Sequence, residues 1–533
     1  MSKPLAHYRR LAVTRTLVFG VCLLMVGVAS ARLPERDLGP ELNDREKAFH
    51  VLNRMSFGPG PGDVERVLEM GWEAWAKEQL DPESIDAEAF DALVVERYPA
   101  LGMTLDTAMQ TYYPQLGPNP SPSQLQRRNQ LRNTVMGELR DAVLYRAVHS
   151  PRQFEEVMVE FWRNHFNIDH SKDAVAYMAP DFEQSVIRRH AFGRFEHMLL
   201  ASATHPAMLV YLDNVVSQKP LTERELRLLE RFEGRDNVPR SVQALGRHRG
   251  LNENYARELM ELHTLGVDRR YKQRDVTELA RVLTGWSVKR TEGGGLEFAF
   301  REEVHDDNRK RLFGRTVRGD GMDQGVSVIR GLARHDYTAD FISYKLCRYL
   351  VRDEPSDALV KRVSRVFQRT RGHLPSVYEA IIFSDDFMFR QNHRVKFKTP
   401  FEFTVSAIRA TGAVVDGGRG THQMLERMGQ PIYRCVDPTG YYDQAEAWLD
   451  PGVLLYRWRF ALALANNDVQ GLRVPDAMQA NISPEQLDSR LIQRVLPGRI
   501  DPLAREELAR ALRRGGVTGA WGLMLGTPEF QQQ

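Results

Sequence analysis

The segment Asn252-Glu-Asn-Tyr-Ala-Arg-Glu-Leu-Met-Glu-Leu-His263 has the three- and four-residue spacing of an amphipathic helix. Tyr255, Leu259 and Leu262 form an apolar stripe suited to packing on a protein interior. Segments with the same spacing recur along most of the chain, so we expect a mainly helical fold: one large multi-helix domain at 45–465 and a helical C-terminal extension at 466–533.

Polar residues of the same segment share a second face. Asn254, Glu258 and Glu261 fall at i, i+4 and i+7 of the helix. Two carboxylates beside an amide can hold a hard divalent cation. Glu253, Arg257 and Glu261 are also four residues apart, and a ladder of ion pairs on a solvated face explains part of the pattern equally well. Both interpretations stay open at this stage.

Helix signals recur on both sides of this segment. Pro is favoured at a helix start and disfavoured inside one, so Ser150-Pro151 breaks the helical stretch 124–166. Asp275 is expected to cap a helix that Gly285 ends. Further helices are expected from Asp63, over 72–80, 222–232, 340–351, 356–369 and 376–387, and in short pieces over 501–533.

One segment has the period of a strand. Leu296-Glu-Phe-Ala-Phe300 follows Gly293-Gly-Gly295, and apolar and polar residues alternate around the glycines. The sequence therefore predicts a small β-hairpin over 288–300. A phosphate-binding loop is disfavoured, because the glycines lack the strand–loop–helix order and the lysine that such loops use.

Two segments carry histidines that could do chemistry. His165 ends the aromatic cluster Phe161-Trp-Arg-Asn-His-Phe166 and is a candidate metal ligand or general base. A core histidine near a helix C-terminus is the structural alternative. His305 and Asp306 lie in a polar loop that can ligate a metal or orient a substrate, or that is simply an exposed turn.

The N-terminal residues have the pattern of a cleaved export signal. Arg9, Arg10 and Arg15 precede the apolar stretch 17–28, and Ala29-Ser30-Ala31 offers a cleavage site. The apolar stretch is shorter than the roughly 20 residues of a membrane-spanning helix. We therefore expect residues 1–31 to be a signal peptide, and the mature chain to lack a membrane span and to be periplasmic or extracellular.

Charge and cysteine content exclude further classes of protein. Removal of residues 1–31 leaves 69 basic and 70 acidic side chains, a net charge of −1, which offers no basis for binding nucleic acid. The chain has three cysteines, of which Cys22 lies in the signal, so a disulfide framework is excluded. Export permits a bond between Cys347 and Cys435, but we favour a buried free thiol at Cys347.

Several of these segments together carry a family resemblance. They are Leu52-Asn-Arg-Met-Ser-Phe-Gly-Pro59, Phe161–Phe166, His205-Pro-Ala-Met-Leu-Val-Tyr-Leu-Asp-Asn214, Asn252–Gly266, Asp275–Trp286, His305-Asp306 and Pro438-Thr-Gly-Tyr441 with Trp448. In these segments the chain resembles the large bacterial domain-of-unknown-function family 1800 over about residues 45–465. This chain departs from the family in one of these segments: it has Thr439 at a position where we expect an acidic residue in the family, which argues against a ligand role at that turn.

The resemblance has implications for the location and the partners of the protein, but not for a reaction. Members are commonly exported and are often paired with a second exported protein similar to sulfatases and alkaline phosphatases. The resemblance supplies no established activity, and therefore no catalytic role for any residue.

Two hypotheses about function follow. The first is an exported enzyme with a polar or divalent-metal site between helices, because unpaired polar groups in apolar helices cost about 1–3 kcal/mol each. Its candidate catalytic residues are His165, Asp213, Asn214, Asn254, Glu258, His305 and Asp306, and its candidate metal ligands are His165, Glu258, Glu261 and His305. The second is a non-catalytic helical scaffold or binding protein of the cell envelope, in which these residues form a buried network that sets how the helices cross.

Overall fold

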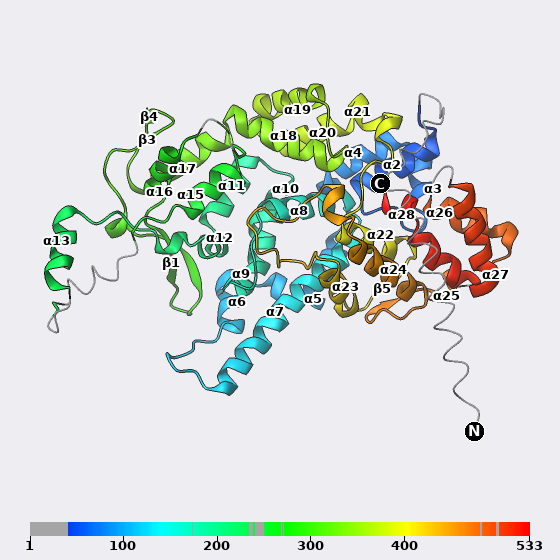
Figure 1. Cartoon of the computed structure of the whole chain (residues 1–533), viewed down its shortest axis with the longest axis horizontal. Coiled ribbons are helices and arrows are strands. Elements are labelled where there is room, and N and C mark those ends of the chain that lie inside the picture. The colour runs from blue at the N-terminus through cyan, green and yellow to red at the C-terminus, as the bar shows by residue number, and fades with distance from the viewer. Residues whose placement is uncertain are drawn as a thin grey trace.

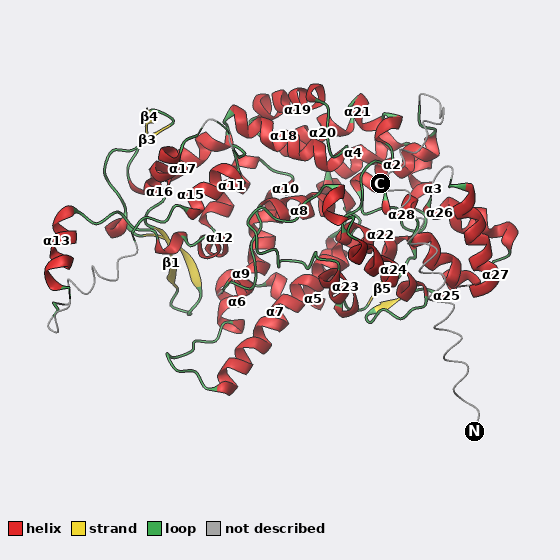
Figure 2. Cartoon of the chain, in the orientation of Figure 1, coloured by secondary structure: helices red, strands yellow, loops and turns green. Residues whose placement is uncertain are grey.

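The chain is described from a computed structural model. The described residues are 41–172, 174–233, 238–239, 250–267, 269, 271–479, 482–496 and 500–533. The expected signal peptide at 1–31 lies outside them. Within the described residues the protein is mainly helical, as predicted, and its strands form small two-stranded antiparallel sheets (Figure 2).

Two of the N-terminal helices were predicted: one that begins at Asp63 and one that spans Trp72–Leu80, and both are present. α3 (Asp63–Met70) and α4 (Trp72–Leu80) are separated by Gly71, whose φ of 80° suits glycine and interrupts the helix. The other elements of this region are α2 (Asp44–Met55), η1 (Pro82–Ser84), α5 (Glu88–Arg97), η2 (Pro99–Gly102) and α6 (Leu105–Tyr112).

Two long helices occupy the expected stretch 124–166. α7 (Pro122–His149) and α8 (Gln153–His165) are separated at Ser150-Pro151, which confirms the predicted break. Most of α8 is buried, and it crosses the middle of the molecule (Figure 1). The elements that follow it are α9 (Val175–Asp181), the π-helical η3 (Phe182–Arg188), α10 (Arg189–Ala191), α11 (Phe195–Thr204), α12 (Pro206–Tyr211), η4 (Asn214–Val216) and α13 (Glu223–Phe232).

The predicted hairpin is present. β1 (Trp286–Arg290) pairs antiparallel with β2 (Leu296–Phe300), so that Trp286 lies opposite Phe300. The glycine turn sits against α6, where a Cβ on Gly295 would lie 2.2 Å from Oδ1 of Asp106. The triple glycine therefore permits close packing of a turn on a helix.

The helix after the Asn252 segment starts three residues earlier than predicted. α15 (Asn254–Glu261) is followed by α16 (Gln273–Val282), whose N-cap is Lys272. Asp275 is the third residue of α16, and its carboxylate accepts a hydrogen bond of 2.9 Å from the amide of Lys272. The predicted N-cap at Asp275 is therefore wrong. Asp275 lies inside the first turn, and its carboxylate accepts a hydrogen bond from the amide of the true N-cap residue.

A layer of helices forms one long edge of the molecule. α18 (Asp336–Leu350) packs beside α19 (Asp357–Thr370), and α20 (Leu374–Ile382) packs on both (Figure 1). α20 ends before the predicted 387 because the hydroxyl of Ser384 caps a separate helix, α21 (Asp385–Met388). The smaller elements nearby are η5 (Glu302–Val304), β3 (Arg311–Leu312), β4 (Arg315–Thr316), α17 (Gly321–Ala333) and η6 (Arg390–Asn392).

The C-terminal helices pack on the main body. α24 (Pro451–Ala465) packs along α27 (Pro502–Leu525), and the amide of Gln533 donates to the carbonyl of Lys396 at 2.8 Å. The other elements are α22 (Pro400–Ala410), β5 (Val414–Val415), α23 (Arg419–Arg427), η7 (Ala445–Trp448), β6 (Leu472–Arg473), α25 (Asp476–Gln479), η8 (Pro484–Gln486), η9 (Asp488–Ile492), α26 (Gln493–Val495) and α28 (Pro528–Gln531). One hydrophobic cluster extends from Ala48 to Phe530, so residues 466–533 share the core of the rest.

Two other expectations concern the thiols and the membrane. Cys347 and Cys435 are both buried and free, so no disulfide joins them. Among the described residues, none of the helices has the combination of length and apolar composition required to cross a bilayer.

Candidate functional site

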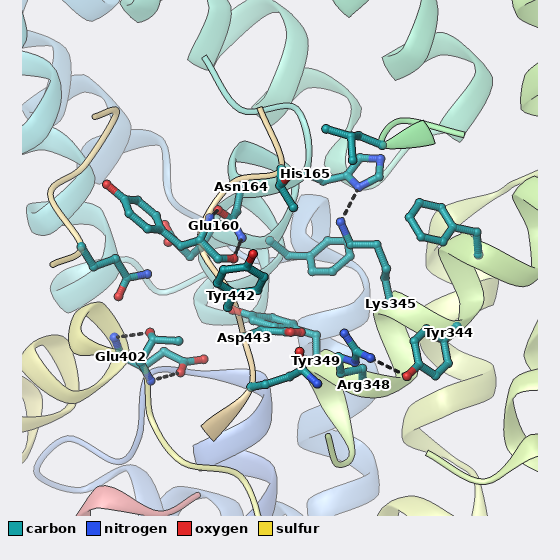
Figure 3. Close-up of a pocket in the computed structure, with 18 of the residues that line it drawn as sticks. Glu160, Asn164, His165, Tyr344, Lys345, Arg348, Tyr349, Glu402, Tyr442 and Asp443 are labelled. Carbon is teal, nitrogen blue, oxygen red and sulfur yellow. Dashed lines mark hydrogen bonds between the residues drawn. The ribbon is translucent and has the colours of Figure 1, made fainter. Parts of the chain in front are cut away.

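A cavity of about 240 Å³, lined by charged and aromatic side chains, lies between α8, α18 and the segment 439–444. The end of α15 and the start of α22 complete its wall. Figure 3 shows side chains from these distant parts of the chain turned toward one another. The cavity brings together residues that the sequence separates by almost 300 positions.

Helical spacing places the key side chains on the cavity wall. Phe341, Lys345 and Tyr349 are four residues apart on α18 and share one face of that helix. On α8, Glu160 and Asn164 are likewise four apart and face the same cavity. The opposite side of α18 carries the apolar residues that anchor it in the core.

His165 is a buried neutral histidine. Its Nε2 lies 3.2 Å from the carbonyl oxygen of His263, and its Nδ1 lies 3.0 Å from Nζ of Lys345. These partners assign the proton to Nε2, which donates to the carbonyl, and leave Nδ1 to accept from the lysine. Burial, reinforced by the charge of Lys345, holds the pKa of His165 well below its ordinary value.

Lys345 is an amine without a carboxylate partner. No ion pair joins it to a carboxylate of the described residues; besides His165, its Nζ lies 5.6 Å from the ring centre of Phe341. Burial lowers the pKa of Lys345 to about 8, with Asp443 opposing the shift and Arg348 adding to it. Near neutral pH the amine can therefore act both as an acid and as a base.

Three of the four carboxylates on the wall are already engaged. Glu160 pairs with Arg163 of the same helix, although burial still raises the pKa of its carboxyl. Glu402 accepts a 2.7 Å hydrogen bond from the amide of Thr399 and thereby caps α22. Glu261 lies 3.4 Å from Arg257.

Two polar groups on the wall remain available to a ligand. The hydroxyl of Tyr349 is buried and has no hydrogen-bond partner within the described part of the chain, and burial together with nearby carboxylates raises its pKa well above the ordinary value. It is therefore a permanent donor. Asp443 faces the same cavity and forms no ion pair with the described residues (Figure 3).

The segment 439–444 is held over the cavity by a reciprocal pair of hydrogen bonds. The Asn164 side chain donates to the carbonyl of Tyr441 and accepts from its amide, both at 2.7 Å. Gly440 has a φ of 78°, and a Cβ there would lie 2.4 Å from the backbone oxygen of Asn164. The Pro438-Thr-Gly440 turn thus permits close contact between this segment and α8.

Of the residues predicted for a site, only His165 and Glu261 line this cavity. Asn214 and Asn254 lie elsewhere, at the corner after α12. Buried Asn214 donates to the carbonyls of Leu283 and Trp286 at 3.2 and 2.8 Å, and Asn254 donates to that of Leu212 at 3.3 Å. These amides join helix ends to the hairpin.

Asp213 and Glu258 also lie outside the cavity. Asp213 forms a partly exposed ion pair with Lys172 at 2.7 Å and has a left-handed φ of 59°. Glu258 is half-buried, and burial, with Glu261 and Asp437 adding to it, raises the pKa of its carboxyl. Neither Asp213 nor Glu258 lies beside His165 on the cavity wall.

His305 and Asp306 form a second buried group outside the cavity. Nδ1 of His305 lies 2.7 Å from the carbonyl of Thr284, while its Nε2 is buried without a partner. Asp306 binds Arg281 at 2.7 Å, and the fully buried Lys310 donates to the backbone carbonyl of Asp306. The two side chains therefore tie their loop to the end of α16.

The predicted metal ligands do not form a cluster. Over the described ranges, no three His, Cys, Asp or Glu side chains are grouped so that they could hold a metal ion. His165 offers its one free nitrogen to Lys345, and Glu261 pairs with Arg257. These contacts do not support a divalent-metal site formed by the predicted ligands.

The sequence reasoning missed the residues that distinguish this cavity. Lys345, Tyr349 and Asp443 were not candidates. The available signal was Lys345 itself, a lone lysine four residues from Phe341 on one side and Tyr349 on the other, within an otherwise core-facing helix.

The fold and the cavity define a helical protein with a small polar site at its centre. The chain belongs to the DUF1800 family, described as proteins of unknown function, and the family model matches residues 50–532. The match includes the segment 466–533 that the motifs alone did not reach. Neither the curated proteins nor the solved structures contain a match to this chain.

Proposed function

We propose that the chain is an enzyme that acts on a small polar molecule in the central cavity, with Lys345 and His165 as an acid–base pair. The observation that carries the proposal is the 3.0 Å contact between Nζ of Lys345 and Nδ1 of His165, beside a cavity and without a carboxylate partner. Buried Lys310 and Lys398 are held by carbonyl and hydroxyl oxygens, whereas no ion pair or hydrogen bond to an oxygen is found for the amine of Lys345 among the described residues.

The energetics support this proposal. Burying a charge without a partner is costly, and well-packed apolar side chains usually replace such a group without loss of stability. Perturbed titratable groups that face a cavity are typical of functional sites. The free hydroxyl of Tyr349 adds a second buried polar group that only a ligand or water would satisfy.

The pair can move a proton without moving its atoms. When Lys345 is protonated, it donates to the Nδ1 lone pair of His165; when a substrate takes that proton, the amine is left as a base. The carbonyl of His263 holds the other ring proton in place, 3.2 Å from Nε2.

A substrate panel with matched variants tests the proposal. Wild type, Lys345→Met and Lys361→Met are assayed on esters, phosphate and sulfate esters, glycosides, and small aldehydes and ketones. Lys361 lies on α19 and is exposed, which makes it the control. We expect turnover of one class that Lys345→Met lowers about 100-fold or more and Lys361→Met leaves unchanged. Failure of the wild type on every class, or equal rates in both variants, contradicts the proposal.

Export and partnership form part of the same proposal. The arginines and apolar stretch of residues 1–31 support secretion with cleavage after Ala31, and the family resemblance supports action beside an exported sulfatase- or phosphatase-like protein. N-terminal sequencing of the protein from the native cell envelope should begin at Arg32. Cross-linking in the same fraction should recover the partner, and its absence would remove the partnership.

A non-catalytic scaffold is the second candidate, and one observation favours it. Asn214, Asn254, His305 and Asp306 all bond to the backbone or to a neighbouring ion, and so order the contacts between helix ends and the hairpin. On this view Asn214→Leu destabilises the fold by about 1–3 kcal/mol through the carbonyls it leaves unpaired. Unchanged stability of Asn214→Leu in urea would contradict a structural role for the corner.

A further inference from the structure

The central cavity contains one lysine amine, that of Lys345, and the groups around it suit covalent chemistry at nitrogen. On one side lies the Nδ1 lone pair of His165, and on the other the ring of Phe341. The buried hydroxyl of Tyr349 faces the same space one turn further along α18. A nucleophile, a proton acceptor and an unused donor therefore share one small cavity.

We propose that Lys345 forms a Schiff base with the carbonyl group of a neutral, hydroxylated aldehyde or ketone. This inference rests on the proposed function, because it names the substrate class of the same site. Lysines that form Schiff bases are desolvated or lie near another cation, so that part of the amine is neutral. Arg348, one turn away on α18, is that second cation.

The atoms balance without an added oxidant or reductant. The neutral amine of Lys345 attacks the carbonyl carbon; a C–N bond forms and the carbonyl π electrons pass to oxygen. The amine nitrogen passes one proton to Nδ1 of His165, and the oxygen takes up a proton from solvent to become a hydroxyl. Loss of that hydroxyl with the proton from His165 breaks the C–O bond, releases water and leaves a protonated imine.

The wall of the cavity favours a neutral ligand with hydroxyl groups. Glu160 and Glu261 are paired with Arg163 and Arg257, so Glu402 and Asp443 balance the positive charges of Lys345 and Arg348. An anionic group on the ligand would upset this balance and would meet the carboxylate of Asp443, which no ion pair with the described residues compensates. Asp443 can accept a hydrogen bond from a ligand hydroxyl, and Tyr349 can donate one.

The size of the cavity limits the ligand to a few carbons. Its volume of about 240 Å³ is below the range of about 300–1,000 Å³ that ligand pockets usually span. A three-carbon compound such as dihydroxyacetone fits these requirements. Pyruvate has similar size but carries a negative charge, so it serves as the matched comparison.

Reductive trapping tests the inference. The full-length protein is incubated with dihydroxyacetone and cyanoborohydride at pH 7.5, and the rate of adduct formation at each lysine is measured by peptide mass spectrometry. We expect Lys345 to react at least about tenfold faster than exposed Lys361, because a pKa of about 8 leaves far more neutral amine than an ordinary lysine has. Pyruvate should react more slowly than dihydroxyacetone at Lys345.

The comparison needs no variant, so folding defects do not affect it. Labelling of Lys345 no faster than that of Lys361 would overturn the inference, and faster trapping of pyruvate would overturn the substrate class. His165→Asn should slow adduct formation at Lys345 and leave that at Lys361 unchanged. An equal rate at Lys345 in His165→Asn and wild type would show that His165 takes no part in the step. Turnover that depends on Lys345 without any trapped adduct leaves the proposed function standing and rejects the Schiff base.

Discussion

The amine of Lys345 on α18 lies 3.0 Å from Nδ1 of His165 on α8. The two residues are 180 positions apart, and the lysine has no ion-pair partner among the described carboxylates. An ammonium that donates only to a neutral imidazole is poorly compensated for its loss of water. This contact therefore affects stability as well as function, and it can be tested without a substrate.

Replacing Lys345 with Met should stabilise the fold below pH 8. The native pKa of about 8 is below the ordinary value, so the unfolded chain binds more protons between about pH 8 and 10.5 and stability rises with pH across that window. Lys345→Met lacks this dependence. We expect its free energy of unfolding in urea to exceed that of wild type by about 1–3 kcal/mol at pH 6.5, and the difference to shrink by pH 10.5.

The control for that measurement is Lys361→Met on the exposed side of α19. It should follow wild type at both pH values. A difference between Lys345→Met and wild type that stays constant with pH would show that Lys345 titrates as an ordinary lysine.

Acid should destabilise the protein partly through buried histidines. Burial, together with the charge of Lys345, lowers the pKa of His263 to about 3, and His165 is shifted the same way. Between about pH 6.5 and 3 the unfolded chain binds protons that the native chain does not, so stability falls as pH falls. Each histidine contributes up to about 1.4 kcal/mol per pH unit in this window.

Unfolding in urea at pH 6 and pH 4.5 measures this slope. His263→Gln should show a shallower loss of stability than wild type, whereas exposed His197→Gln should match wild type. Parallel slopes for all three proteins would mean that His263 is protonated in the folded state.

The pair of Arg163 and Glu183 should be essential for stability. Their side chains are almost fully buried and lie 3.0 Å apart, and Tyr433 donates to the same carboxylate at 2.6 Å. Burial opposes ionisation, yet Arg163 and Arg188 hold the pKa of Glu183 below its ordinary value. Glu183→Gln removes the one carboxylate that Arg163 and Arg188 share and leaves each with a single carboxylate, Glu160 or Glu156. Because one partner of a buried ion pair is lost, we expect a loss of about 3–5 kcal/mol in urea unfolding.

An exposed ion pair provides the comparison. Glu223 and Arg227 lie 3.6 Å apart on α13 with side chains 88% and 72% exposed. Glu223→Gln should change stability by less than about 0.5 kcal/mol. Equal effects of Glu223→Gln and Glu183→Gln would contradict the importance assigned to burial.

Gly440→Ala should loosen the segment over the cavity. The left-handed φ and the 2.4 Å approach of a Cβ to the oxygen of Asn164 both oppose any side chain here. Gly62 has a similar φ of 88° but open space around it, so Gly62→Ala isolates the backbone cost. We expect Gly440→Ala to lose about 1–3 kcal/mol more than Gly62→Ala, with faster hydrogen exchange at the amide of Tyr441. Equal losses of stability in Gly440→Ala and Gly62→Ala would contradict a steric clash between a side chain at residue 440 and Asn164.

Local rules predicted most helices well. α4 spans the predicted Trp72–Leu80 because Gly71 and Pro82 interrupt helical structure on either side, whatever lies around them. The start of α16 was misplaced because a carboxylate can serve a helix start either as its cap or from the third position, and the sequence pattern is the same for both.

The candidate site was only half predictable. His165 was identified because a histidine among aromatic residues is conspicuous, but its partners are Lys345 on α18 and the carbonyl of His263 just after α15. Asn214 and His305 were both candidates, but for the His305 loop an exposed turn was an open alternative, and this alternative is wrong because both side chains are buried. Nothing local could reveal that their partners are carbonyls at helix ends instead of a ligand.

The order of the amino acids alone settled the helical class, the hairpin and the family motifs, because these depend on spacing and backbone chemistry within a few residues. Folding in three dimensions decided which polar groups meet. In the sequence, nothing distinguishes Lys345 from a surface lysine. What distinguishes it in the folded protein is burial beside His165, which lies on another helix. Desolvation and charge–charge contact act through space between distant segments, and that part of the chemistry appears only when the helices are packed.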